Sequence, residues 1–167
     1  IYTIAYTLSL HDALPITLDD AAFVVPSPGI PPASPLFAQA VARGVTVVSE
    51  IELAASVARA PVVAITGTDG KSTTTEMVGA VARGAGRSVE VAGNIGTPLS
   101  ERARAVPPDG VLVAEVSAFQ LWSCGFFRPQ VAIITNVAPD HTDYFGGDYD
   151  AYIASKARVL RDMGAGD

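Results

Sequence analysis

The sequence predicts an α/β protein in which helices flank a parallel sheet. Apolar, β-branched runs alternate along the chain with stretches of helical periodicity, which is the pattern of strands joined by crossover helices. Alanine, valine and glycine are plentiful, as suits buried parallel strands beneath helices. In addition, the strand expected at Val62–Ile65 runs through Gly67 and Gly70 into Lys71-Ser72 and a helix. A strand, a glycine loop and a helix in this order indicate a P-loop-type sheet.

The elements follow from these patterns in chain order. The expected strands are residues 22–25, 45–48, 62–65, 88–91, 110–116 and 131–135, and the expected helices are residues 35–43, 50–59, 73–83 and 150–163. Proline and glycine exclude regular structure from residues 26–32. Gly44 ends the first helix, and Ala60-Pro61 is the expected hinge between two domains.

The glycine loop is the strongest functional signal. Backbone N–H groups at the start of a helix bind phosphate, and glycines let the backbone approach it. Lys71 is expected to reach the β- and γ-phosphates of a nucleotide, and the Ser72 hydroxyl to bind Mg²⁺. The pattern is the short G-x-x-G-K-S form, because Ile65 stands where the longer G-x-x-x-x-G-K-[ST] form has its first glycine. The alternative is an ordinary turn between a strand and a helix.

Polar residues follow the other expected strands. Ligands of parallel sheets bind at the carboxyl ends of the strands, where we expect Asn94, Glu115 and Asp140-His141 to meet the glycine loop. A carboxylate on a buried strand is costly unless it is paired or binds a metal, so Glu115 is a candidate Mg²⁺ ligand. The alternatives are a salt bridge from Glu115 to an arginine and a capping or surface role for His141. Asp143 is expected to be a cap or turn residue.

Composition excludes several classes of partner. The net charge of −6 and the lack of a basic cluster argue against binding to nucleic acid or to an anionic membrane. The sequence has no uninterrupted run of about twenty apolar residues, so it does not predict a membrane helix. The single cysteine, Cys124, permits no internal disulfide, fits a cytoplasmic location and is expected to be a buried thiol. Residues 1–16 lack the features of a signal peptide.

Four segments together resemble the Mur ligase family. They are Gly67-Thr-Asp-Gly-Lys-Ser-Thr-Thr74, Gly93-Asn-Ile-Gly96, Glu115-Val-Ser-Ala-Phe-Gln-Leu121 and Thr135-Asn-Val-Ala-Pro-Asp-His-Thr-Asp143. The resemblance implies that residues 17–58 are the C-terminal part of a Rossmann-like N-terminal domain that binds the UDP-linked substrate. Residues 59–167 would be the first part of the ATP-binding central domain, and the C-terminal domain would be absent. Residues 1–16 match nothing in the family and are interpreted as a foreign segment.

The resemblance implies an ATP-dependent amide ligase of peptidoglycan synthesis. The segment from Glu115 to Leu121 is similar to the branch that adds D-glutamate to UDP-N-acetylmuramoyl-L-alanine through an acyl phosphate. The cofactors would be ATP and Mg²⁺, and the complete enzyme would be a monomer. The 167-residue chain by itself would form no product.

The resemblance also implies a role for each matched residue. The implied nucleotide-binding residues are Gly67, Thr68, Asp69, Gly70, Lys71, Ser72 and Thr73. The implied metal ligands are Ser72, Glu115 and His141, and the implied substrate-binding residues are Ser27, Gly29, Asn94 and Ser117. Lys71, His141 and Lys156 would be catalytic, with Lys156 matching a lysine that the family carbamylates. The alternative for Lys156 is a solvated surface lysine.

Two positions depart from the family pattern, and two other functions stay open. Asp69 replaces the usual asparagine and adds negative charge near the phosphates, and Ala118 stands where a second serine is common. The first alternative function is another Mur-type or folylpolyglutamate-type ligase that joins a carboxylate to an amine. The second is a P-loop NTPase without ligation chemistry, although that class has the longer glycine loop.

Overall fold

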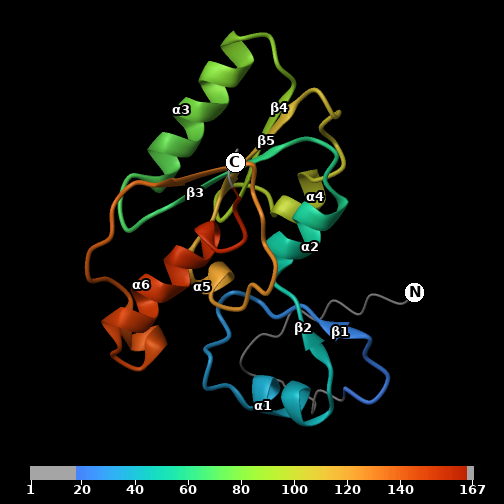
Figure 1. The fold of residues 1–167 in the computed structure, drawn as a ribbon, viewed down its shortest axis with the longest axis vertical. Coiled ribbons are helices and arrows are strands. Elements are labelled where there is room, and N and C mark those ends of the chain that lie inside the picture. Colours follow the sequence, from blue (N-terminus) through green and yellow to red (C-terminus); the bar gives the residue numbers. More distant parts are fainter. Residues whose placement is uncertain (1–17, 165–167) are drawn as a thin grey trace.

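The computed structural model describes residues 18–164 and contains a four-stranded, wholly parallel sheet (Figure 1). The strand order is β4-β5-β3-β6. These strands are β3 (Val62–Thr66), β4 (Val89–Gly93), β5 (Val111–Glu115) and β6 (Val131–Ile134). The predicted parallel α/β fold is therefore confirmed. The segment interpreted as foreign, residues 1–16, lies outside the described residues.

Helices cover both faces of this sheet. The buried core joins Val62, Ala64, Leu112 and Ala114 on one face to Ile51 of α2 (Glu50–Val57) and Leu99 of α4 (Leu99–Arg102). The long helix α3 (Lys71–Gly84) packs on the other face, and in Figure 1 it lies across the strands from α2 and α4. Its Gly79 permits close packing, because a Cβ atom there would lie 2.7 Å from Cγ2 of Val91.

A second, smaller sheet precedes the main one. Strands β1 (Phe23–Val24) and β2 (Thr46–Val47) pair in parallel, and α1 (Pro35–Ala42) connects them. Ser34 caps α1 through its side chain, and Gly44 has φ +66° just beyond the helix. The buried residues of this region, among those described, are Leu18, Leu36 and Ala40.

Several boundaries differ from the sequence prediction. The predicted helix 150–163 is wrong at its C-terminal end, because α6 (Tyr149–Ala157) gives way to a 3₁₀ turn at Arg158–Leu160. The side chains of Arg158 and Arg161 there donate hydrogen bonds to backbone carbonyls of another loop. The helix predicted from Thr73 begins instead at Lys71, because Gly70 adopts a left-handed conformation and forms the N-cap.

Three short helical segments were not predicted from the sequence. They are α4, α5 (Ala118–Leu121) and a 3₁₀ helix at Thr142–Phe145. Four residues are too few to show a helical period, and such segments depend on tertiary packing. None of the helices in residues 18–164 is both long and apolar enough to cross a membrane.

Candidate active site

The register of the sheet brings the predicted site residues to one edge. Glu115, the last residue of β5, lies beside Gly93 at the end of β4 and beside Ile65 near the end of β3. On the other side of β3, Ile65 and Thr66 pair with Ile133 and Ile134 of β6. The glycine loop starts at Gly67, so all these polar segments leave the sheet at its carboxyl edge, as predicted.

Backbone constraints explain two glycines at this edge. Gly67 has φ +147°, and a Cβ atom there would lie 1.9 Å from Oγ1 of Thr135. Gly93 has φ +111°, and a Cβ atom there would lie 2.3 Å from the Glu115 carbonyl oxygen. Both positions therefore require glycine, and both let neighbouring strand ends approach closely.

The segment after β6 holds the glycine loop in shape. The backbone N–H of Asp69 donates to Oδ1 of Asn136 at 3.0 Å, and the Asp69 carbonyl accepts from Oγ1 of Thr135 at 2.7 Å. Thr68 donates its N–H to the Asn136 carbonyl at 3.1 Å. Asp69 itself is exposed, so its carboxylate has access to solvent. The loop conformation thus depends on side chains about 70 residues away in the sequence.

Two lysines lie against successive carbonyls of the glycine loop. Nζ of Lys71 donates to the Thr68 carbonyl at 2.8 Å, and Nζ of Lys156 donates to the Gly67 carbonyl at 2.6 Å. Lys156 is only 2% exposed, which rules out a solvated surface lysine. Burial, together with the charge of Lys71, lowers the pKa of Lys156 to about 8. A substantial fraction of neutral amine is therefore present near pH 8.

Glu115 has one satisfied and one unsatisfied oxygen. Oε1 accepts from Nδ2 of Asn94 at 2.8 Å, while Oε2 is buried without a hydrogen-bond partner among the described residues. The partner of Glu115 is therefore Asn94 rather than the arginine that the alternative required. A buried carboxylate oxygen without a partner is costly. This oxygen could accept a hydrogen bond or bind a cation supplied by a ligand.

Ser117 is buried at the start of α5, two residues beyond Glu115. Its N–H donates to Oε1 of Gln120 at 2.9 Å, and its hydroxyl oxygen accepts from the Gln120 N–H at 3.2 Å. These bonds form a capping box, which fixes the side chain of Ser117.

The other two predicted substrate residues, Ser27 and Gly29, lie in the exposed loop after β1. Ser27 lines a small pocket together with Phe119 and Gln120 of α5. The Tyr144 hydroxyl lies 2.9 Å from the Pro28 carbonyl and 2.7 Å from the Ile30 carbonyl, and its single proton can serve one of them at a time. The structure thus brings Ser27 close to the segment that carries Ser117.

His141 lies at the same edge but is mostly exposed. Its side chain is 62% exposed, with Nε2 3.4 Å from Oδ2 of Asp140 and its ring 5.4 Å from that of Phe119. It adopts φ +49°, a left-handed conformation that is unusual outside glycine. The ring is therefore accessible to a ligand. Asp143 lies in the 3₁₀ helix that follows, consistent with the predicted turn role.

Two further residues that support the site were missed from the sequence. The buried Tyr152 places its ring 4.6 Å from Nζ of Lys156 and its hydroxyl 3.0 Å from Oγ1 of Thr68. Tyr152 precedes Lys156 by four residues on a predicted helix, and this spacing indicates that the two side chains lie next to each other. Gln120 was also identifiable, because Ser-x-x-Gln is the sequence of a capping box.

A family model for the Mur ligase middle domain matches residues 65–167. This chain belongs to the Mur ligase family. The chain is similar to proteins named UDP-N-acetylmuramoylalanine--D-glutamate ligase. That of Chlorobaculum parvum is 44% identical over 153 residues, which is 89% of this chain and 32% of the relative. That of Salinibacter ruber is 45% identical over 153 residues, or 89% of this chain and 33% of the relative.

This member of the Mur ligase family therefore spans about a third of the length of the curated relatives it matches. Among solved structures, a MurF from Acinetobacter baumannii aligns with a TM-score of 0.52 and 20% identity over 78% of this chain and 35% of that chain. At this identity the structural likeness supports the fold alone.

Proposed function

We propose that this chain is part of an ATP-dependent ligase that adds D-glutamate to UDP-N-acetylmuramoyl-L-alanine in peptidoglycan synthesis. In this proposal, residues 17–58 belong to the domain for the UDP-linked substrate, and residues 59–167 begin the ATP-binding domain. The similarity to relatives of that name supports the choice of substrates. We further propose that the complete enzyme is a cytoplasmic monomer.

The observation that carries the proposal is the buried, unpartnered Oε2 of Glu115 beside the glycine loop. Mg²⁺ prefers oxygen ligands, so this oxygen and the Ser72 hydroxyl at the start of α3 would be its protein ligands. Among residues 18–164, no group of three or more His, Cys, Asp or Glu side chains could hold a metal. A cation here would therefore complete its shell with phosphate oxygens and water, as Mg²⁺ commonly does.

The reaction requires two anions to approach each other. A carboxylate oxygen of the UDP-linked substrate attacks the γ-phosphorus of ATP, ADP leaves, and an acyl phosphate forms. The amine of D-glutamate then attacks the acyl carbon, loses a proton, and inorganic phosphate leaves. Bound Mg²⁺ would supply positive charge that offsets repulsion between carboxylate and phosphate. Lys71 would add a further positive charge at the β- and γ-phosphates.

The remaining residues have proposed roles in orientation and charge. Asn94, Ser117, Ser27 and Gly29 would contact the UDP-linked substrate. His141 would contribute a ligand to a second Mg²⁺. The neutral amine of Lys156 would react with CO₂ and lose a proton, and its low exposure and the lowered pKa support this reaction. The resulting carbamate is an anion, whereas the ammonium form would repel a cation.

Phosphate release by the full-length protein tests this proposal. We expect release only when ATP, UDP-N-acetylmuramoyl-L-alanine and D-glutamate are all present. Lys71→Ala should lower turnover by about a thousandfold, as loss of a charge stabiliser at a reacting group does, and leave the circular dichroism spectrum unchanged.

Two outcomes would replace the proposal. Rapid ATP hydrolysis without either co-substrate would identify a P-loop NTPase. Turnover with another amino acid, but not with D-glutamate, would identify a different Mur-type or folylpolyglutamate-type ligase. A fully active Lys71→Ala variant would remove the assigned role of the glycine loop.

A further inference from the structure

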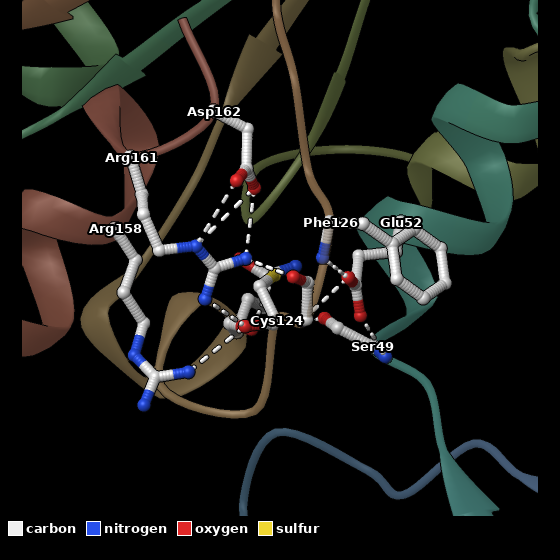
Figure 2. Close-up of polar contacts among 9 residues, drawn as sticks. Ser49, Glu52, Cys124, Phe126, Arg158, Arg161 and Asp162 are labelled. Atoms are coloured by element: carbon white, nitrogen blue, oxygen red, sulfur yellow. Dashed lines mark hydrogen bonds and ion pairs between the residues drawn. The ribbon is translucent and has the colours of Figure 1, made fainter.

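Glu52 is a buried carboxylate that the proposed reaction does not use. It lies on the first turn of α2, is 2% exposed, and accepts three backbone hydrogen bonds. Oε1 accepts from the N–H groups of Gly125 at 2.6 Å and Phe126 at 2.5 Å, and Oε2 accepts from that of Ser49 at 3.0 Å. Figure 2 shows this carboxylate facing the loop Cys124–Phe126.

The acceptor oxygens of a carboxylate match this arrangement. All three partners are donors, and a carboxylate is an acceptor at both oxygens. A glutamine of the same shape would turn its NH₂ group toward at least one backbone N–H. Such a change leaves a buried donor unsatisfied, which typically costs more than the hydrogen bond itself contributed.

The same turn of α2 also holds α5. Oγ of Ser49 donates to the Gln120 carbonyl at 2.9 Å, and Sγ of Cys124 donates to that carbonyl at 3.3 Å. The side chain of Gln120 in turn caps Ser117. A short chain of bonds therefore leads from the turn that carries Glu52 to Ser117.

The opposite side of the loop is held by guanidinium groups. Nη1 of Arg158 donates to the Cys124 carbonyl at 2.8 Å, and Nη2 of Arg161 donates to the Gly125 carbonyl (Figure 2). These arginines follow Lys156 by two and five residues. The N–H groups of this loop therefore donate to a carboxylate, and its carbonyls accept from guanidinium cations. Charge-assisted hydrogen bonds on both sides favour a single position of the loop.

We propose that Glu52 is a positioning residue for the UDP-linked substrate, because it fixes the loop Cys124–Phe126 and thereby Ser117. This inference rests on the proposed function. The glycine loop is held separately, by Thr135 and Asn136. Loss of the Glu52 carboxylate should therefore weaken binding of the UDP-linked substrate and spare binding of ATP.

The test compares Glu52→Gln with Glu50→Gln in the full-length protein. Glu50 lies on the same turn of α2 and also accepts a backbone hydrogen bond, from the Ser100 N–H at 2.6 Å, but it does not contact the loop. We expect Glu52→Gln to raise KM for UDP-N-acetylmuramoyl-L-alanine about tenfold and to change KM for ATP by less than about twofold, in keeping with the energy of one hydrogen bond to a charged group. Glu50→Gln should leave both KM values unchanged.

Cys124 gives a second readout that does not need turnover. Its thiol is fully buried, and burial raises its pKa to about 12, so it should react slowly with iodoacetamide. Glu52→Gln should speed alkylation of Cys124 at a temperature well below unfolding, measured by mass spectrometry of the Cys124 peptide, and Glu50→Gln should not. A folded Glu52→Gln variant with wild-type KM values would overturn the proposal.

The outcomes separate this inference from the proposed function. Should the wild-type protein fail to use the UDP-linked substrate, the proposed function is wrong, while the difference in alkylation still tests the contact between Glu52 and the loop. Should Glu52→Gln fail to fold, Ser49→Ala removes the bond to the Gln120 carbonyl without changing charge. That variant is expected to raise the same KM about threefold, and an unchanged KM would overturn the proposal.

Discussion

The two sheets of this chain position their loops in different ways. The four-stranded sheet has a continuous buried core, and its register alone places Glu115 beside the start of the glycine loop. The two-stranded sheet buries only Leu18, Leu36 and Ala40 among the described residues. The loop that follows β1, residues 26–32, contacts Tyr144 from the 3₁₀ helix after β6.

This difference shows which part of the candidate site depends on its own strands. On the proposed phosphate side, strand pairing sets where the glycine loop starts, since neighbouring strand ends cannot shift without breaking backbone hydrogen bonds. The side chains of Thr135 and Asn136 then hold the shape of that loop. On the proposed substrate side, which is the loop of residues 26–32, contacts from distant side chains hold the backbone, because the short sheet contributes little. Variants on the phosphate side should therefore affect turnover, and variants on the substrate side should affect KM.

After Lys71→Ala, the largest expected effect is again on the proposed phosphate side, at Lys156. Lys156→Ala removes the buried amine that contacts the Gly67 carbonyl, and we expect turnover of the full-length protein to fall about a hundredfold. Formate, acetate or raised bicarbonate should restore part of the activity, because these anions can replace the negative charge of the proposed carbamate. The measurement is phosphate release with and without each anion, and wild-type turnover without them would remove the proposed role of Lys156.

A smaller effect is expected on the pH dependence of stability. Lys156 has a folded-state pKa of about 8, below its ordinary value of 10.5, so between these values the unfolded state binds more protons. The free energy of unfolding due to this residue therefore rises with pH from about 8 to about 10.5, with a limiting slope of tenfold in the folding constant per pH unit.

Lys156→Met provides the comparison, since it keeps the length of the side chain without a titrating group. Urea unfolding at pH 7.5 and at pH 9.5 measures the free energy of unfolding of both proteins. We expect the value for wild type minus the value for the variant to be larger at pH 9.5 than at pH 7.5. Cys124 acts in the opposite direction above its ordinary pKa of 9, because burial raises its folded-state pKa, but it is present in both proteins. An equal difference at both pH values would contradict the assigned pKa shift.

The smallest expected effect is on the substrate side. Tyr144→Phe removes the hydroxyl that contacts the Pro28 and Ile30 carbonyls, and it should raise KM for the UDP-linked substrate about threefold at unchanged turnover. Tyr149→Phe is the matched control, because among residues 18–164 no hydrogen bond to its hydroxyl is found. A loss of turnover instead would mean that the two sides are not positioned independently.

Much of the main sheet could be predicted from the sequence. The apolar runs that became β3, β5 and β6 were located to within about two residues, because buried parallel strands are nearly uniform in composition. The short helices α4 and α5 could not be found by periodicity, and the end of α6 is set where Arg158 and Arg161 bond to a distant loop. The sequence did not single out Glu52, because its partners Gly125 and Phe126 lie 73 and 74 residues further along the chain.

The sequence by itself determined the parallel α/β fold, the glycine loop and the order of polar residues along the carboxyl edge. These features are local, because glycine spacing and the N-terminus of a helix already specify where backbone N–H groups point. Only the tertiary structure decided that Oε2 of Glu115 has no partner, that Lys156 is buried beside Lys71, and that Glu52 holds the loop after α5. Burial, desolvation and charge–charge contacts depend on residues far apart in the sequence, and no local pattern records them.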